Sequence, residues 1–288
     1  MNNKTTEKTR MVPVPSNAII PERDLGQAPI LEACHLGIDF AGLRAVDDLN
    51  LTVGRTEIAG LIGPNGAGKT TVFNMLTNVY QPTRGTIMLN GVNTAGKTTH
   101  QVNKMGIART FQNIRLFNNM SVLENVKVGL HNSINTNLLS SIFRLPVNAR
   151  EEKKSDERAL ELLDFFHMAD MASAEAGSLP YGAQRRLEIV RALATNPGII
   201  LLDEPAAGMN PSETAELMEN IRRIRDTFQI AVMLIEHDMN LVMGICEGIV
   251  VLNYGRIIAK GTPEEIKSNP TVIEAYLGKN GGTHNAEG

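Results

Sequence analysis

Two stretches of this sequence have the residue types and spacing of a phosphate-binding loop. Residues 63–71 read GPNGAGKTT and residues 91–99 read GVNTAGKTT, so both fit the pattern G-x-x-x-x-G-K-S/T. In such a loop, backbone N–H groups surround phosphate oxygens, the lysine contacts the outer phosphates, and the hydroxyl reaches Mg²⁺. The chemistry would be the binding of a nucleoside triphosphate. Because a pattern this short also occurs by chance, the flanking residues must decide between the two copies.

The first copy lies between a predicted buried strand and a predicted helix. The apolar run EIAGLIG, residues 57–63, precedes it, and Val72, Phe73 and Leu76 follow at helical spacing. A helix that begins at the loop adds its free N–H groups and the positive end of its dipole to the anion site. We therefore predict that residues 63–71 bind the phosphates.

The second copy has the context of a surface turn. Residues 85–91 read GTIMLNG, in which apolar residues alternate with other positions and Asn90-Gly91 is a strong hairpin signal. After the motif, only Val102 and Met105 could anchor a helix. We predict a turn followed by a short helix, with no role for Lys97 in nucleotide binding.

Two acids at the end of another apolar run could complete the site. Residues 199–204 read IILLDE. Asp203 is the candidate to hold Mg²⁺ jointly with the Thr70 hydroxyl, and Glu204 the candidate to orient the attacking water or take its proton. A single acid there could simply end a strand in a polar turn. A pair after four aliphatic residues, downstream of a phosphate loop, favours an NTPase.

A predicted helix lies directly between these motifs. The segment SLPYG leads into AQRRLEIVRALATNP, in which Leu187, Val190 and Ala194 share one helical face, and GIILLDEPAAG follows at once. In this arrangement the sequence resembles the ATP-binding-cassette family over about residues 30–278. The resemblance implies an α/β P-loop NTPase fold with a RecA-like core, an antiparallel β section and a helical subdomain. It also implies that the chain hydrolyses ATP with Mg²⁺ as cofactor.

The resemblance implies roles for individual residues. Contacts to ATP would come from the first loop and from an aromatic residue that stacks on adenine, namely Gly63, Pro64, Asn65, Gly66, Ala67, Gly68, Lys69, Thr70, Thr71 and Phe40. Signature residues would reach the ATP of an opposite subunit, namely Leu179, Pro180, Tyr181 and Gly182. Phe40 could equally be a core side chain.

Two loop residues gain a catalytic role from the same resemblance. Gln112, in TFQN, matches the Q-loop glutamine, which coordinates Mg²⁺ together with Thr70 and Asp203. His237, in IEHDM, matches the switch histidine, which acts with Glu204 in hydrolysis. Taken alone, Gln112 and His237 would be ordinary polar loop residues.

Two places depart from the family pattern. The signature, usually Leu-Ser-Gly-Gly-Gln, reads LPYGA over residues 179–183, so its serine hydroxyl is absent. The D-loop ends in Asn210 where the family has aspartate. Both positions contact the opposite subunit in the family. We therefore expect a second, related ATPase subunit as the working partner.

The elements that must position these residues can be outlined from local patterns. Residues 30–53 read as antiparallel strands, Ser121 with Glu124 forms a capping box at a helix start, and a further helix starts at Asn210-Pro211. Residues 250–261 read as a hairpin, followed by a capped helix. These elements form one cassette domain over residues 30–278.

Within that domain we expect a helical subdomain over about residues 114–195. It includes a mixed-charge helix at residues 149–166, whose apolar side is predicted to contain Leu160, Leu163 and Phe166. Helices inserted in this way are where such ATPases contact a membrane protein. Residues 1–29 are expected to form a flexible leader, not a signal peptide, and residues 279–288 a flexible tail.

Composition excludes several other classes of protein. The formal net charge of −3 and the pI of about 6.1 give no reason to expect a nucleic-acid partner. The two cysteines, Cys34 and Cys246, lie far apart in sequence and fit inert thiols in a reducing compartment. No apolar run approaches the roughly 20 residues of a membrane-spanning helix.

Within the family, the sequence looks most like the ATP-binding subunit of branched-chain amino acid importers. The segments GIARTFQNIRLFNNMSVLENV, LPYGAQRRLEIVRAL and DEPAAGMNP carry this resemblance. It implies two membrane-spanning permease subunits, an extracytoplasmic amino-acid-binding protein, and a place on the cytoplasmic face of the inner membrane. Leucine, isoleucine or valine as cargo follows from the resemblance alone. The alternatives are an exporter ATPase for lipid-like cargo and a soluble cassette protein outside transport.

Overall fold

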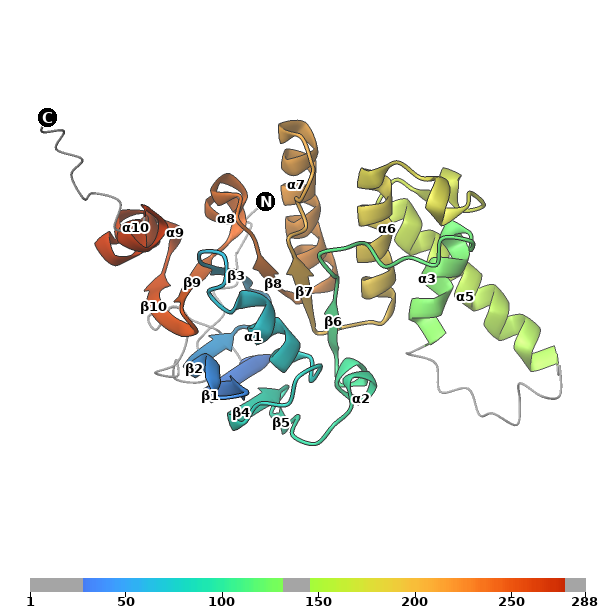
Figure 1. Cartoon of the computed structure of the whole chain (residues 1–288). Helices are drawn as coiled ribbons and strands as arrows, with labels where there is room; N and C mark the ends of the chain where they lie inside the picture. Colours follow the sequence, from blue (N-terminus) through green and yellow to red (C-terminus); the bar gives the residue numbers. More distant parts are fainter. Residues whose placement is uncertain (1–27, 132–145, 278–288) are drawn as a thin grey trace, which may run out of the picture.

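The computed structural model describes residues 28–131 and 146–277 of the chain (Figure 1). The predicted tail, residues 279–288, lies outside the described residues, as do residues 1–27 of the predicted leader. In the described ranges, no helix is both long enough and apolar enough to cross a membrane.

The larger sheet has six strands in the order β10-β9-β3-β8-β7-β6. Five of these strands are parallel to one another: β3 (Ile58–Ile62), β6 (Ile107–Arg109), β7 (Ile199–Asp203), β8 (Ala231–Ile235) and β9 (Gly248–Asn253). The edge strand β10 (Arg256–Gly261) is antiparallel to β9, as the hairpin pattern predicted. Because the other strands are parallel, the loops that follow β3, β6, β7 and β8 meet at one edge of the sheet.

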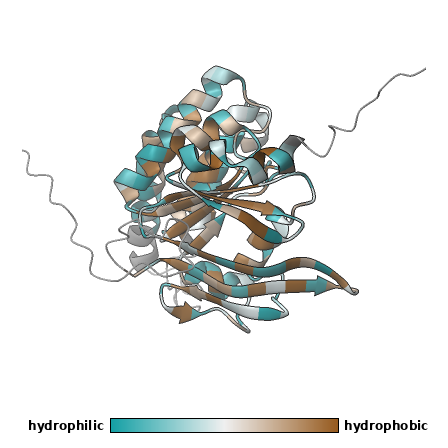
Figure 2. Ribbon diagram, turned by 90° about the vertical axis from the view of Figure 1, so that its left-hand side faces the viewer, coloured by the Kyte–Doolittle hydropathy of each residue, from teal (hydrophilic) through white to brown (hydrophobic). Residues whose placement is uncertain are grey.

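A second, antiparallel sheet lies against the first. Its order is β2-β1-β4-β5, with β1 at Leu31–Phe40, β2 at Leu43–Val53, β4 at Arg84–Leu89 and β5 at Val92–Asn93. Figure 2 shows the two sheets as separate layers, with helices over the other face of the larger sheet. The α/β fold with an antiparallel section, predicted from sequence, is confirmed.

Strand β3 explains how the layers are joined. Its five residues are all buried, and they alternate between two hydrophobic cores. Ile58 and Ile62 face the core on the helical side, whereas Ala59 and Leu61 face the core shared with the antiparallel sheet. A strand covered on both faces reads as a continuous apolar run, which is why EIAGLIG indicated a central strand.

The helices follow the local signals in the sequence. Those described are α1 (Lys69–Leu76), α2 (Thr99–Lys104), α3 (Val122–His131), α5 (Pro146–Phe165), α6 (Tyr181–Ala194), α7 (Pro211–Phe228), α8 (Met239–Ile245), α9 (Pro263–Ser268) and α10 (Pro270–Leu277). The capping box predicted at Ser121 forms, since the Glu124 N–H donates to Ser121 Oγ at 3.2 Å. The helix predicted to start at Asn210-Pro211 is capped as well, since the Glu213 N–H donates to Asn210 Oδ1 at 3.0 Å. Helices α3, α5 and α6 pack together beside the sheets (Figure 1).

One predicted helix face is partly wrong. Leu163 is fully buried and Phe166 nearly so, as predicted, but the side chain of Leu160 is 40% exposed. The buried stripe runs instead through Ala159, Leu162, Leu163 and Phe166. These positions follow the spacing i, i+3, i+4, i+7, from which Leu160 is rotated by about 100°.

Candidate functional site

The loop 63–68 connects the end of β3 to the start of α1, so the strand-loop-helix context predicted for residues 63–71 is confirmed. Glycine is required where this loop packs most closely. A Cβ on Gly63 would lie 2.0 Å from the carbonyl oxygen of Leu252, and one on Gly68 would lie 3.0 Å from that of Ala45. Gly68 also has a φ of 103° at the N-cap of α1. The loop is therefore held against β9 and β2, at the N-terminus of a helix.

Lys69 lies inside this loop. Its Nζ donates hydrogen bonds to the backbone oxygens of Gly63, at 2.7 Å, and Pro64, at 3.0 Å. Burial lowers the pKa of Lys69, whereas the nearby charges of Glu204 and Asp203 raise it. The ammonium thus lies between the loop and the two acids, where phosphate oxygens would be stronger acceptors than the carbonyls that it now contacts.

Asp203, at the end of β7, is buried and paired with a cation that the sequence analysis missed. Arg109, at the end of β6, donates from Nη2 to Asp203 Oδ2 at 2.8 Å and from Nη1 to Asn74 Oδ1 at 2.7 Å. Only 6% of the Arg109 side chain and 4% of the Asp203 side chain are exposed. The available signal was a charged residue at the end of an apolar strand, next to the Q-loop.

The donor set at this edge of the sheet fits Mg²⁺. The Asp203 carboxylate, the Thr70 hydroxyl and the Gln112 side-chain carbonyl are hard oxygen donors of the kind that magnesium prefers. Asp203 keeps a second oxygen beside the one that Arg109 contacts. Thr70 is exposed in the first turn of α1, immediately after the lysine of the loop. The residues present are therefore suited to hold the metal with a bound nucleotide.

The structure brings Gln112 and Glu204 together, although 92 residues separate them. Gln112 Nε2 donates to Glu204 Oε2 at 2.9 Å. Glu204 itself has a φ of 47°, in the left-handed region that only a few residue types adopt readily. Its backbone N–H donates to the Ile235 carbonyl oxygen of β8 at 2.9 Å. A constrained turn after β7 thus fixes the carboxylate of Glu204 at the sheet edge.

His237 follows the neighbouring strand, β8, and its side chain is 69% exposed. The backbone around it is held by Glu236, a buried residue that the sequence analysis did not single out. Glu236 Oε1 accepts the Ala206 N–H at 2.7 Å, and Oε2 accepts the His237 N–H at 3.0 Å. This carboxylate therefore joins the loop after β8 to the loop after β7.

The signature residues lie apart from the loop of the same chain. Pro180 is the N-cap of α6, Leu179 is buried, and Tyr181 is 47% exposed. Figure 1 shows α6 on the far side of β7 and β6 from α1. The N–H groups of Tyr181 and Gly182 belong to the first turn of α6, where helix N–H groups lack intrahelical acceptors. The first turn of α6 therefore offers backbone N–H groups at a place apart from the loop 63–68 of the same chain.

Phe40 was predicted either to stack on adenine or to be a core side chain, and the structure places it at the surface. It is 41% exposed at the end of β1, and its ring meets Tyr80 edge to face with the centroids 5.2 Å apart. A core role for Phe40 is therefore excluded, whereas stacking on adenine stays a prediction.

The second glycine-rich stretch forms the predicted turn and short helix. Asn90 and Gly91 have φ values of 50° and 75° between β4 and β5, and α2 follows with Thr98 as its N-cap. Asn78, just after the C-terminal end of α1, donates to the Lys97 carbonyl oxygen at 3.1 Å. Lys97 thus lies near the end of α1 that is opposite to the phosphate loop.

Comparison with known proteins agrees with this site. Residues 46–207 match the family described as ABC transporter, which covers more than half of the chain. The chain belongs to the ABC transporter family. It is an ABC ATPase, and residues 256–281 match a second family, described as branched-chain amino acid ATP-binding cassette transporter.

Named relatives match this ABC ATPase over most of its chain. It is 49% identical over 251 residues to the high-affinity branched-chain amino acid transport ATP-binding protein BraF of Pseudomonas aeruginosa, covering 87% of this chain and 98% of that protein. It is 48% identical, with the same coverage, to LivG of Escherichia coli, which has the same description. The lipopolysaccharide export ATP-binding protein LptB of Escherichia coli is 34% identical over 249 residues, 86% of this chain and 97% of LptB.

Solved structures agree on the fold. A crystal structure of an ATP-binding cassette of an ABC transporter in its ADP conformation matches with a TM-score of 0.76 and 29% identity, covering 88% of this chain and all of that one. A nucleotide-free cassette matches with a TM-score of 0.75 and 30% identity, covering 87% and 100%.

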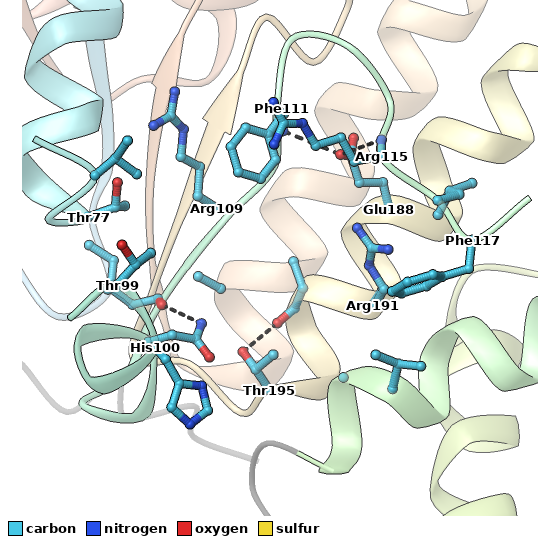
Figure 3. Close-up of a pocket in the computed structure, with 18 residues that line it drawn as sticks. Thr77, Thr99, His100, Arg109, Phe111, Arg115, Phe117, Glu188, Arg191 and Thr195 are labelled. Carbon is cyan, nitrogen blue, oxygen red and sulfur yellow. Dashed lines mark hydrogen bonds between the residues drawn. The ribbon is translucent and has the colours of Figure 1, made fainter.

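The ABC ATPase also has a cavity next to the candidate site, since Arg109, which contacts Asp203, is one of the residues that line it. It has a volume of about 850 Å³ and lies between α2, the segment after β6, α3 and α6 (Figure 3). Two arginines lie against aromatic rings on its wall: Arg115 over Phe111 at 4.2 Å and Arg191 over Phe117 at 5.6 Å. Burial lowers the pKa of Arg191, while Glu188 raises it. The cavity therefore combines aromatic surface with an exposed cation, Arg115, and a partly buried one, Arg191.

Proposed function

We propose that this chain is the ATP-hydrolysing subunit of an importer for branched-chain amino acids. The single observation that carries this proposal is the match of residues 256–281, beyond the residues 46–207 that match the general ABC transporter family, to the branched-chain amino acid ATP-binding cassette transporter family. The identity of 48–49% to BraF and LivG supports it. The exporter alternative has weaker support, since LptB is 34% identical.

The site supports a defined division of labour in hydrolysis. Backbone N–H groups of the loop, from which Pro64 is excluded because it has none, and the Lys69 ammonium would hold the β- and γ-phosphates. Asp203 and Thr70 would hold Mg²⁺, with Gln112 as a further oxygen donor, and the chemistry supplied by such an ion is neutralisation of charge on the phosphates. Glu204 accepts the proton of the attacking water, with Gln112 fixing its carboxylate and His237 close along the sheet edge.

The cavity in Figure 3 is the surface that we assign to the permease. A permease helix with an aromatic or aliphatic face would fill its volume, and a carboxylate on that helix would pair with Arg191. Arg191 favours such a partner because burial disfavours its charge in the free subunit. This docking would hold the subunit on the cytoplasmic face of the membrane. The permease pair and an extracytoplasmic amino-acid-binding protein complete the proposed importer.

The second ATPase of the proposed complex is a related but different subunit. Proline at position 180 supplies neither a hydroxyl nor an N–H to the opposite γ-phosphate. Loss of one donor to developing phosphoryl charge costs on the order of 3 kcal/mol in the transition state. Two copies of this chain would carry the defect twice. A partner with an intact signature would close over the ATP held by Lys69 and Thr70.

The test is uptake of labelled leucine, isoleucine and valine by cells or vesicles that contain the assembled transporter. We expect Glu204→Gln to abolish uptake and ATP turnover while ATP binding stays within about twofold, because the amide keeps the shape but not the proton acceptor. Uptake that survives with full turnover would refute the role of Glu204. Turnover without uptake of any of the three amino acids would refute the substrate.

The same vesicles test the asymmetry of the two ATP sites. Replacement of the catalytic glutamate in the partner subunit should reduce turnover less than Glu204→Gln does. Equal losses would show that Pro180 is no handicap.

A further inference from the structure

Arg185 of α6 is the feature that the mechanism has not used. Its side chain is entirely buried, and so is nearly all of Glu188, one turn later, whose Oε2 accepts from Arg185 Nη1 at 2.9 Å. Burial of a guanidinium costs free energy unless its N–H donors have acceptors. The ion pair with Glu188 does not by itself explain why an arginine lies here, because apolar residues of similar size often replace a buried ion pair without loss of stability. The remaining hydrogen bonds of Arg185 therefore indicate what it does.

The other acceptors of Arg185 are three backbone carbonyl oxygens outside α6. Nη1 donates to Phe111 at 2.6 Å, and Nη2 donates to Gln112 at 2.9 Å and to Glu204 at 3.3 Å. Phe111 and Gln112 belong to the Q-loop, and Glu204 is the proposed base. One guanidinium thus contacts the backbone of both residues whose side chains meet at the site.

Glu188 also binds the Q-loop backbone, as an acceptor of N–H groups. Its Oε1 accepts the backbone N–H of Phe111 at 3.4 Å and that of Arg115 at 3.3 Å. The pair therefore holds both donors and acceptors of the Q-loop backbone. Because these bonds go to the main chain, local sequence patterns in the Q-loop give no sign of them.

We propose that Arg185 is a positioning residue, which holds Gln112 and Glu204 in register for hydrolysis. The hydrogen bond from Gln112 Nε2 to Glu204 Oε2 depends on the relative placement of two loops, after β6 and after β7. Arg185 fixes that placement with the rigid fork of its guanidinium. A lysine in its place keeps the charge but is a point donor that cannot span three carbonyls.

The first measurement is steady-state ATPase activity of the assembled transporter, in which the chain has its partner ATPase subunit, as a function of ATP concentration. We expect Arg185→Lys to lower kcat roughly tenfold or more, because a misplacement of about 1 Å has effects of that size. The KM for ATP should change less than about twofold, because the phosphate loop is untouched. Arg186→Lys is the matched control. Arg186 is the next residue of α6 and pairs with Glu216 of α7 at 3.4 Å, and its replacement should leave kcat unchanged.

The second measurement is hydrogen exchange of the isolated chain, which does not depend on any transport partner. Arg185→Lys should speed exchange of the amides of residues 111–115, with no change in α7. If Arg185→Lys lowers the melting temperature below that of the assay, Glu188→Gln takes its place, with the same expected loss of kcat at constant KM. The proposal is overturned if kcat is unchanged, if KM rises while kcat holds, or if Arg186→Lys has an equal effect. Because none of these outcomes involves cargo, failure here leaves the proposed import of amino acids standing.

Discussion

Residues 63–71 and residues 91–99 share seven of their nine residues, yet they form different structures. The first stretch follows a central strand that is buried on both faces and begins α1. The second follows β4 of the antiparallel sheet, turns at Asn90-Gly91 and leads into a helix of six residues. The difference lies in the flanking elements, not in the motif.

The comparison shows what a phosphate loop requires beyond its own residues. Around the first copy, β7 and β6 bring Asp203 and Gln112 to the same sheet edge. Near the second copy, the Asn78 side chain donates hydrogen bonds to the backbone oxygens of Thr94 and Lys97. Glycines at the same motif positions therefore form a loop between a central strand and a helix in one place and a tight surface turn in the other.

The largest difference between the copies is expected on removal of each lysine. Lys69→Ala should abolish measurable turnover and weaken ATP binding by roughly 100-fold, since hydrogen bonds to charged groups contribute roughly 1.5 to 3 kcal/mol each. Lys97→Ala should leave both nearly intact. ATP binding by calorimetry and turnover by phosphate release check the two variants. Similar losses from both would mean that the flanking elements do not decide which copy binds nucleotide.

The first glycine of each copy gives a second, smaller contrast. At Gly63 an alanine Cβ would meet the Leu252 carbonyl oxygen at 2.0 Å, whereas at Gly91 it would have no atom within 4 Å. Gly63→Ala should therefore destabilise the fold by roughly 3 kcal/mol or more and impair ATP binding. Gly91→Ala should cost roughly 1 kcal/mol, for its left-handed φ of 75° alone. Urea unfolding measures both values, and an equal cost would contradict the packing argument.

Local signals in the sequence predicted much of the fold because they report local physics. The capping box predicted at Ser121 forms, and the helices predicted to start at Asn210 and after residue 261 are each capped by contacts between residues three apart. The phosphate loop could be chosen from its neighbours because strand and helix lie directly beside it. The wrong placement of Leu160 has a local cause as well, since an apolar residue at the edge of a helical stripe can face either way.

The contacts that sequence analysis missed join residues far apart in the chain. Arg109 meets Asp203 across 94 residues, Arg185 meets Phe111 across 74, and Glu236 meets Ala206 across 30. The first and third follow from the order of the parallel strands and the second from the packing of α6 against the segment after β6, none of which a short pattern records. Gln112 and His237 were found only through the resemblance of the sequence to a family, because as single polar residues in loops they carry no distinguishing spacing.

The hydroxyl that follows Lys97 gives the smallest expected effect. Thr98 Oγ1 accepts the Gln101 N–H at 3.3 Å, and the Gln101 side chain accepts the Thr98 N–H at 2.8 Å, so this hydroxyl caps α2. Thr98→Ala should lower the free energy of unfolding by about 1 kcal/mol and leave turnover unchanged. Thr98→Ser, which keeps the cap, should restore most of that stability. The chain has no tryptophan, so urea unfolding is followed by circular dichroism.

Thr70→Ala is the matched variant in the first copy, where the hydroxyl faces the proposed metal site. It should abolish Mg²⁺-dependent turnover, because a magnesium ligand is lost, while the melting temperature changes little since no capping bond of α1 depends on it. The two threonines thus separate a catalytic hydroxyl from a structural one at the same place in the motif. A loss of turnover in Thr98→Ala would show that the motif alone, without its neighbours, determines what the hydroxyl does. Full turnover in Thr70→Ala would refute the role of the Thr70 hydroxyl at the proposed metal site.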